Sequence, residues 1–350
     1  MRLLSVIFAA MILAGSASIA AAQSGVADSA TAIINDRPLG ARIVGGGDAE
    51  PGEYPSVVAL VRTGFGELDE RLFCGGTLVA RRWVLTAAHC VHNAFNRPLE
   101  SDFFRVVAGI NDLVDDTPEQ EHSVLQIVIH PDYDGTLELP PNDIALIELQ
   151  TEVANPEATL FTGDTNDFTG TFGSIAGWGA IEYSDPFNPE YPTSLQDAVV
   201  PLITNEVCNS PESYDGLIMD THLCAGFADG KVDACAGDSG GPLFISVDGV
   251  QLQAGITSFG SGCGLPLFYG IYTNVSHFIP WMSEYIPVPF QSPELVAFRD
   301  EQKNRPPAAQ GVNSDEGSSA GAFGQPVLWL FLLVAYRRVV VISGVKLTLR

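Results

Sequence analysis

Short runs of apolar residues, separated by turn-forming residues, recur along the middle of this 350-residue chain. Such spacing is typical of an all-β sandwich or barrel. The predicted strands form a first and a second series: 54–60, 83–86, 103–107, 124–129 and 143–149, then 173–178, 195–202, 242–247, 251–257 and 270–275. Residues 275–286 have helical spacing and predict a helix that ends the folded region.

The pattern changes at both ends of the chain. A charged residue, an apolar run and a small-residue site predict a secretory signal peptide over residues 1–22. The polar segment 23–42 is interpreted as a pro-peptide. Residues 288–325, rich in Pro, Gly and Ser, predict a flexible linker. Residues 326–350 hold an apolar run that is short for a membrane span, interrupted by a basic pair.

Composition narrows the class of protein. The formal net charge of −25 and pI near 4.3 disfavour nucleic acids and anionic membranes as partners. The six cysteines suit three disulfides in an oxidising compartment, and the sequence alone leaves their pairing open. A zinc site is the competing interpretation, but no Cys-x-x-Cys spacing supports it.

Three motifs supply the parts of a nucleophilic site. Residues 237–242 read Gly-Asp-Ser-Gly-Gly-Pro and contain Ser239, whose hydroxyl needs a base before it can attack. Residues 85–90, Leu-Thr-Ala-Ala-His-Cys, supply His89, and the Asn-Asp-Ile-Ala-Leu run at 142–146 supplies Asp143.

From residue 43 to about 287, these motifs resemble those of the trypsin- and chymotrypsin-like serine proteases, in the same His, Asp, Ser order. The resemblance implies two six-stranded antiparallel barrels, at about 43–155 and 156–287, with the active site between them and a C-terminal helix. It also implies three disulfides: Cys74–Cys90, Cys208–Cys224 and Cys235–Cys263.

The resemblance assigns a role to each catalytic residue. His89 would take the hydroxyl proton of Ser239 during attack on a peptide carbonyl and return it to the leaving amine. Asp143 would hold the His89 ring in the required tautomer. The backbone N–H groups of Gly237 and Ser239 would form the oxyanion hole, and an acyl-enzyme would follow.

Substrate selection is expected to depend on Asp233, which lies six residues before the nucleophile. In trypsin-like members this carboxylate, at the floor of the pocket, pairs with Arg or Lys. Gly260 and Gly270 would keep the pocket open. Residues 258–260, starting with Ser258, would pair with the substrate backbone, although Phe259 stands where Trp is commoner. Ala234 replaces the usual Ser, which predicts a preference for Arg over Lys.

Residues 42–46 resemble a zymogen activation site. An activating protease would cut after Arg42, and the new ammonium group of Ile43 would then pair with Asp238 and order the pocket. An ordinary strand start beside a chance basic residue is the alternative.

No metal or cofactor is expected. Ile110 stands where the calcium loop of animal trypsins has its first carboxylate, so the acidic residues that follow are interpreted as a solvated loop. They are Asp112, Asp115, Asp116, Glu119 and Glu121. The remaining histidines are expected on surfaces or turns: His92, His122, His130, His222 and His277.

The tail from residue 317 to the basic pair resembles a GlyGly-CTERM sorting signal, which an intramembrane protease removes after export. This implies a secreted or surface-associated protein of a Gram-negative bacterium, and a retained membrane anchor is the alternative. The favoured function is a secreted, zymogen-activated serine endopeptidase acting on proteins or peptides. An inactive binding homologue or an esterase are the other candidates.

Overall fold

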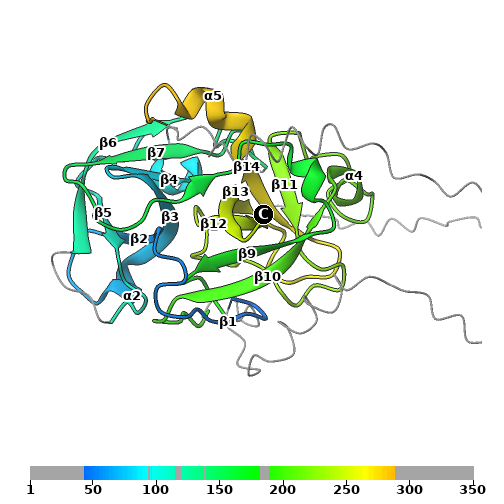
Figure 1. Cartoon of the computed structure of the whole chain (residues 1–350), viewed down its shortest axis with the longest axis horizontal. Helices are drawn as coiled ribbons and strands as arrows, with labels where there is room; N and C mark the ends of the chain where they lie inside the picture. Colours follow the sequence, from blue (N-terminus) through cyan, green and yellow to red (C-terminus); the bar gives the residue numbers. More distant parts are fainter. Residues whose placement is uncertain are drawn as a thin grey trace, which may run out of the picture. The chain divides into compact units, whose positions relative to one another are not determined.

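The computed structural model describes residues 43–93, 95, 97–114, 120–137, 139–181 and 189–287 (Figure 1). The expected signal peptide, pro-peptide, linker and tail lie outside the described residues, and so does Arg42. Within the described ranges, no helix is long and apolar enough to cross a membrane.

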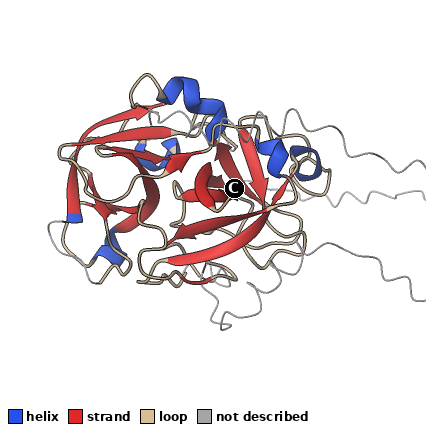
Figure 2. Ribbon diagram, viewed as in Figure 1, coloured by secondary structure: helices blue, strands red, loops and turns tan. Residues whose placement is uncertain are grey.

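The first half of the folded region forms a closed antiparallel barrel in the strand order β2-β3-β4-β7-β6-β5 (Figures 1 and 2). Its strands are β2 (Val57–Arg62), β3 (Leu72–Ala80), β4 (Trp83–Thr86), β5 (Phe104–Ala108), β6 (Glu121–Ile129) and β7 (Ala145–Leu149). Two single-turn helices connect strands in this half: α2 (Leu68–Arg71) and α3 (Ala88–Val91).

The alternation of side chains along β2 explains why the strand is apolar on both faces. Successive strand residues point to opposite sides of a sheet. Val58 and Leu60 pack into the core of the first barrel. Val57 and Val61 point the other way, into a cluster with Trp178 of the second half. One face of β2 is therefore buried in the interior of the first barrel, and its other face is buried against the second half.

The second half forms a ring of six antiparallel strands, β9-β10-β11-β14-β13-β12, which closes because β12 pairs with β9. These strands are β9 (Phe172–Gly177), β10 (Gln196–Ile203), β11 (His222–Ala225), β12 (Pro242–Val247), β13 (Val250–Phe259) and β14 (Gly270–Asn274). Two short strands extend the sheet: β1 (Gly47–Asp48) pairs with β10, and β8 (Thr159–Leu160) pairs in parallel with β13. Single-turn helices η2 (Thr165–Phe168) and α4 (Asn205–Cys208) lie between these strands.

The chain ends its folded part with a helix that packs on the first barrel. The 3-10 turn η3 (Val275–Phe278) continues into α5 (Ile279–Met282). The residues at both ends of these two elements are buried in the core of the first barrel: Val275, Phe278, Ile279 and Met282. Val275 lies three and four positions before Phe278 and Ile279, and Met282 lies four and three positions after them, so all four share one helix face. In Figure 1, α5 lies beside β6 and β7, so the last element of the second half covers the first.

Three disulfides pair all of the cysteines: Cys74–Cys90, Cys208–Cys224 and Cys235–Cys263. They are the pairs that the resemblance implied. They close loops of 16, 16 and 28 residues. On chain-entropy grounds each contributes about 3 kcal/mol to the free energy of unfolding.

The predicted fold class is confirmed: two six-stranded antiparallel barrels with a short C-terminal helix. Four strands were missing from the sequence prediction: the two-residue strands β1 and β8, and the barrel strands β3 and β11. β3 was missed because Gly75 and Gly76 interrupt its apolar run. β11 was missed because it is only four residues long and begins with His222.

Candidate active site

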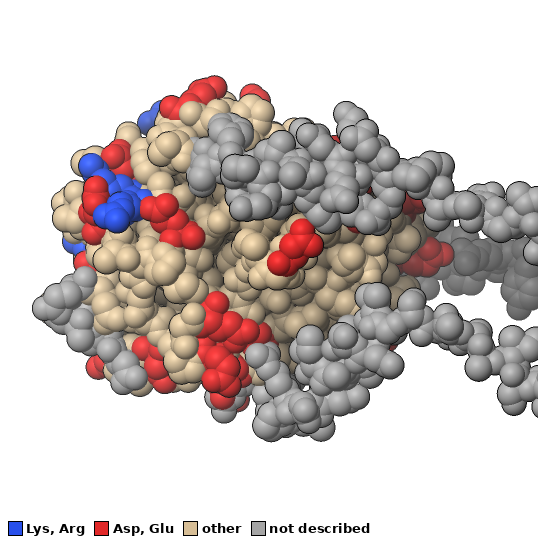
Figure 3. Space-filling view, viewed as in Figure 1, with Lys and Arg blue, Asp and Glu red and all other residues tan. Residues whose placement is uncertain are grey.

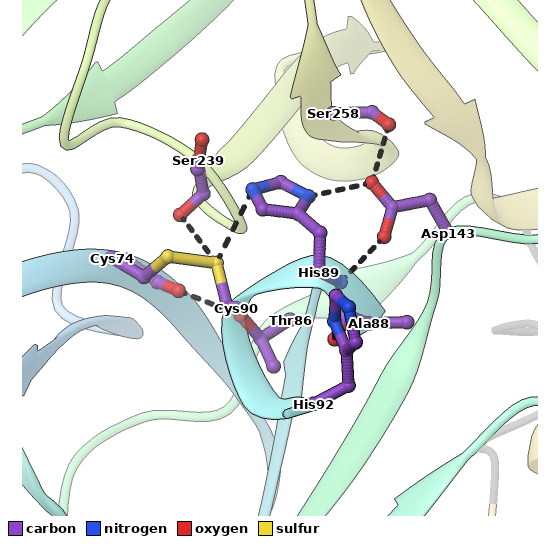
Figure 4. Close-up of a disulfide and its surroundings, with 10 residues drawn as sticks. Cys74, Thr86, Ala88, His89, Cys90, His92, Asp143, Ser239 and Ser258 are labelled. Atoms are coloured by element: carbon purple, nitrogen blue, oxygen red, sulfur yellow. Dashed lines mark hydrogen bonds and ion pairs between the residues drawn. A yellow bond between two sulfur atoms is a disulfide. The ribbon is translucent and has the colours of Figure 1, made fainter. Parts of the chain in front are cut away.

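His89 and Asp143 are brought together by the pairing of β4 with β7. Thr86, the last residue of β4, lies opposite Ala145, the first residue of β7. His89 therefore follows one strand while Asp143 precedes its neighbour. His89 Nδ1 lies 2.7 Å from Asp143 Oδ2, and the His89 backbone N–H donates to Asp143 Oδ1 at 2.8 Å (Figure 4). Two contacts thus fix both the ring and the carboxylate.

The second barrel also holds Asp143, which is completely buried. Ser258 Oγ donates to its Oδ2 at 2.5 Å, and Thr273 Oγ1 donates to its backbone oxygen at 2.7 Å. Burial alone would raise the pKa of this carboxyl, but the charge of His89 and the hydrogen bonds outweigh burial and lower it. For His89, burial lowers the pKa and Asp143 raises it, with a net increase. Asp143 is therefore ionised at neutral pH.

Ser239 lies on the other side of the His89 ring from Asp143 (Figure 4). Its loop belongs to the second barrel but is tied to the first, since the Gly75 N–H donates to the Ser239 backbone oxygen at 2.8 Å. The Gly240 N–H donates to Thr257 O at 2.8 Å. A Cβ on Gly240 would lie 2.2 Å from Thr86 Oγ1, so only glycine fits where the loop meets the first barrel.

The amide groups of Gly237 and Ser239 lie on either side of Asp238 along the chain. Gly237 has a φ of 100°, which glycine adopts freely and other residues do not. A Cβ at Gly237 would also lie 3.0 Å from the Cα of Gly179. In the part of the chain that the structure describes, the N–H groups of Gly237 and Ser239 have no acceptor. Both amides can therefore bind a negatively charged oxygen next to the serine side chain.

A cavity of about 200 Å³ opens beside Ser239 and reaches Asp233. Its wall includes Ser258 and Gly260. Asp233 is 4% exposed, and its Oδ2 accepts a hydrogen bond from the Gly264 N–H at 3.0 Å. Its Oδ1 receives none from any described residue. A carboxylate oxygen without a partner at the end of a narrow cavity suits a cationic side chain.

Two neighbours define the floor of this cavity. A Cβ on Gly270 would lie 2.7 Å from Asp233 Oδ1 and 3.0 Å from Tyr272 Oη, so the position needs glycine. The Tyr272 hydroxyl is buried and has no hydrogen-bond partner among the described residues. Burial raises the pKa of Asp233 to about 7, although hydrogen bonds from the Gly264 and Ala234 amides act in the opposite direction.

Asp238 is buried directly beneath the nucleophile loop. Its carboxylate accepts hydrogen bonds from the Gly179 N–H at 2.8 Å and the Cys235 N–H at 2.9 Å. Burial nevertheless raises its pKa to about 6. Ile43, at the expected activation site, is completely buried and has a φ of 52°, which is unusual for a β-branched residue. The next residue, Val44, forms a bridge with Asp233 (its oxygen accepts from the Asp233 N–H at 3.1 Å).

Two acidic residues of the expected solvated loop are half-buried and are bound by other residues of the protein. Asp112 accepts hydrogen bonds from Ser194 Oγ at 3.1 Å and from the Val114 N–H at 3.1 Å. Glu121 forms an ion pair with Arg71 at 2.6 Å. Asp115, Asp116 and Glu119 lie outside the described residues.

One expectation about the histidines was wrong. His222 is not on a surface or a turn: it begins β11 and is only 1% exposed. The sequence interpretation failed because β11 was not recognised, so nothing indicated that this residue enters a barrel wall.

Several residues around the site gave no signal in the sequence. Thr273, Gly75 and Gly264 each hold a site residue that is far away along the chain. Tyr272 also lines the cavity, but its place in an apolar strand gives no sign that its hydroxyl lies near Asp233. These contacts join residues that are far apart along the chain, within one barrel or between the two, so local pattern cannot reveal them.

The surface charge is uneven. On the face shown in Figure 3, Lys and Arg side chains gather over the first barrel at one end, while Asp and Glu are spread widely. Of the seven described Lys and Arg residues, only Lys231 lies in the second half. The part of the molecule that contains Asp233 is therefore strongly acidic, which attracts cationic groups over several ångströms.

Comparison with known proteins agrees with this geometry. The family model described as Trypsin matches residues 43–282. Transmembrane protease serine 5 from Homo sapiens is 37% identical over 252 residues, which make up 71% of this chain and 52% of that protein. The chain thus spans about half the length of this relative. On the match to the family model over most of its folded region, the chain belongs to the trypsin family of serine endopeptidases.

Proposed function

We propose that this chain is an endopeptidase that cuts after Arg, and less efficiently after Lys, once its own Arg42–Ile43 bond has been cleaved. The observation that carries the proposal is the position of the His89 ring between Asp143 and Ser239, beside a cavity that ends at Asp233. The substrates are proteins or peptides, as expected for the family.

The reaction follows from these positions. His89 takes the hydroxyl proton of Ser239 as the oxygen attacks the peptide carbonyl, and returns it to the leaving amine. Asp143 accepts from Nδ1–H of His89, so Nε2, which lies 3.6 Å from Cys90 Sγ, is the ring nitrogen that acts as the base. The amides of Gly237 and Ser239 stabilise the oxyanion. Water then attacks the acyl-enzyme through the same steps in reverse.

The Asp233 cavity selects the residue before the cut bond. Oδ1 of Asp233 is available for an ion pair, and a guanidinium can also donate to the nearby Tyr272 hydroxyl. Ala234 offers no hydroxyl here. The Lys side chain is shorter than that of Arg, and its ammonium group depends on several acceptors around a point charge. The missing hydroxyl at Ala234 therefore weakens binding of Lys more than binding of a guanidinium, which forks onto the carboxylate. Arg is therefore preferred over Lys.

Activation by cleavage after Arg42 rests on Asp238. Its buried carboxyl has two backbone donors but no ion pair with another described residue, and its raised pKa reflects the cost of that charge. A new ammonium at Ile43 would supply the cation. Cleavage would also remove the restriction on the φ angle of Ile43, which is unfavourable in the intact chain.

Export to the cell surface or medium is proposed from the sequence of both ends. The segment 1–22 would direct secretion, and an intramembrane protease would remove the tail 326–350 after export, unless the tail is kept as an anchor. Three disulfides are consistent with an oxidising compartment.

The test uses fluorogenic peptides that end in Arg, Lys or Phe. The chain cleaved after Arg42 is compared with the uncleaved chain and with a cleaved Ser239→Ala variant. We expect turnover of the Arg peptide above the Lys peptide, and only from cleaved chain with Ser239 intact. Absence of turnover from folded, cleaved protein would refute the proposed activity and favour a binding role. Preference for Phe would show that Asp233 does not select the substrate.

A further inference from the structure

The buried histidine His222 has no part in the mechanism above, yet it contacts both Pro140, three residues before Asp143, and Phe259, which lines the Asp233 cavity. It begins β11 and pairs with Thr273 of β14 in the sheet register. Thr273 donates its hydroxyl to the backbone oxygen of Asp143. Both residues of this pair therefore face the segment of the first barrel that ends at Asp143.

The contacts of His222 determine which ring nitrogen carries the proton. Its Nδ1 accepts a hydrogen bond from the Met219 N–H at 3.2 Å, so Nδ1 is unprotonated. In the neutral ring the proton then lies on Nε2, which is 3.4 Å from the backbone oxygen of Pro140. This is a long but directed hydrogen bond. Burial lowers the pKa of His222, although the hydrogen bond to Pro140 and the charge of Asp143 act in the opposite direction, and the ring stays neutral at neutral pH.

The ring of His222 also supports Phe259. The two ring centroids are 5.4 Å apart at an interplanar angle of 88°, which is an edge-to-face contact. Phe259 is supported on another side by Tyr214, at 6.4 Å and 78°. Phe259 lines the Asp233 cavity and is half exposed. Leu139, next to Pro140, belongs to the same apolar cluster.

One histidine thus joins Phe259, on the second barrel, to Pro140, on the first. The substrate residue that enters the Asp233 cavity lies directly before the cut bond. The residues preceding it must run along the segment 258–260 that lines the cavity, and so past Phe259. The distance and angle between the Phe259 ring and the 139–140 segment then determine how well these residues bind.

We propose that His222 is a positioning residue: its hydrogen bond to Pro140 fixes the segment before Asp143 relative to the Phe259 ring, and so sets how the substrate residues preceding Arg bind. The inference rests on the proposed function for its substrate, but it concerns binding of the extended peptide and not the chemistry at Ser239. It predicts that the benefit of extra apolar residues before Arg depends on the hydrogen bond from His222 to Pro140.

Three variants separate the contacts of His222. His222→Gln carries an amide donor at the place of Nε2 and can still reach Pro140. His222→Asn carries its amide at the place of Nδ1, so it can keep the Met219 contact but cannot reach Pro140. His222→Leu loses both. His130→Leu is the matched control, because His130 is a half-buried histidine whose ring packs on Phe278 and Trp281 instead of Phe259.

The measurement is the ratio of kcat/KM for a blocked tetrapeptide amide, with apolar residues before Arg, to kcat/KM for a blocked single-Arg amide. We expect the Asn and Leu variants to lower this ratio about five-fold, the worth of one neutral hydrogen bond, mainly through KM. The Gln variant and the His130 control should stay within about two-fold of the parent, well below the effect of one lost bond. The Asn and Gln variants keep the test valid if the Leu variant does not fold.

A second readout distinguishes this inference from the proposed activity. Binding of the same two peptides is measured in the Ser239→Ala background, where no turnover is needed. A parent that binds the tetrapeptide in a His222-dependent way but never cuts it would refute the activity and keep the inference. A ratio that is equal in the Asn, Leu and parent proteins, or a parent that gains nothing from the extra residues, would overturn the inference.

Discussion

Replacement of Asp233 by Asn tests the electrostatics of the cavity in two opposite directions. The carboxyl is 4% exposed and accepts hydrogen bonds from the Gly264 and Ala234 amides. Asn has nearly the same shape but no charge. The change should therefore weaken binding of Arg while making the empty protein more stable, because it removes a buried charge that no described residue pairs with in an ion pair.

The size of the stability effect follows from the pKa. Burial raises the pKa of Asp233 from 3.8 to about 7 in the folded protein. A difference of about 3 in pKa corresponds to about 4 kcal/mol between folded and unfolded states. Because the folded-state pKa is the higher one, stability is complete below about pH 4 and is lost as the pH rises to 7. Asp233→Asn should thus match the parent near pH 4 and exceed it by up to about 4 kcal/mol at pH 8.

The size of the activity effect follows from the lost ion pair. An Arg side chain in the cavity of the variant would be buried without its counterion, which costs about 3–5 kcal/mol. This corresponds to a fall of roughly 10²- to 10³-fold or more in kcat/KM for Arg peptides. In the parent, KM for Arg peptides should also rise as the pH falls below about 7, where Asp233 becomes protonated in the empty cavity.

Two assays are needed: kcat/KM for Arg and Phe peptides at pH 8, and denaturant unfolding of the uncleaved chain at pH 4 and pH 8. Ser239→Ala is the control for unfolding, since it changes no buried charge. The reasoning would be refuted if Asp233→Asn kept Arg turnover within ten-fold of the parent. A loss of stability at pH 8 would also refute it, because it would mean that the carboxylate is stabilised in the fold.

Three further changes test other parts of the site. Asp143→Asn should lower kcat about 10⁴-fold with little change in KM, because the amide no longer holds the His89 tautomer, and steady-state kinetics would measure it. Retention of a tenth of the parental kcat would contradict that role. Arg42→Gln should keep the bond between residues 42 and 43 intact and the chain inactive after treatment with an Arg-specific protease, with N-terminal sequencing and turnover as the readouts, whereas activity without cleavage of that bond would exclude a zymogen. Ala234→Ser should raise kcat/KM for Lys relative to Arg about ten-fold, since its hydroxyl adds an acceptor for the ammonium. An unchanged ratio in matched peptides would show that this position does not face the substrate.

Much of the fold could be predicted from pattern alone. Ten of the strands coincide with short apolar runs that were recognised in the sequence, and an uninterrupted apolar run such as β2 already implies burial on both faces. β3 could not be predicted in the same way, because Gly75 and Gly76 carry no hydrophobic signal. The structure explains them: the Gly75 amide holds Ser239, and a Cβ on Gly76 would lie 2.8 Å from Val84.

The sequence by itself determined the identity of the candidate reactive residues, since His89, Asp143 and Ser239 each lie in a short local motif with its own chemical meaning. Only the tertiary structure decided what surrounds them. The raised pKa of Asp233 depends on burial by several segments, and the position of His222 between Pro140 and Phe259 depends on the packing of two barrels. Both are properties of groups that are far apart along the chain, and such distances and dielectric surroundings exist only after folding.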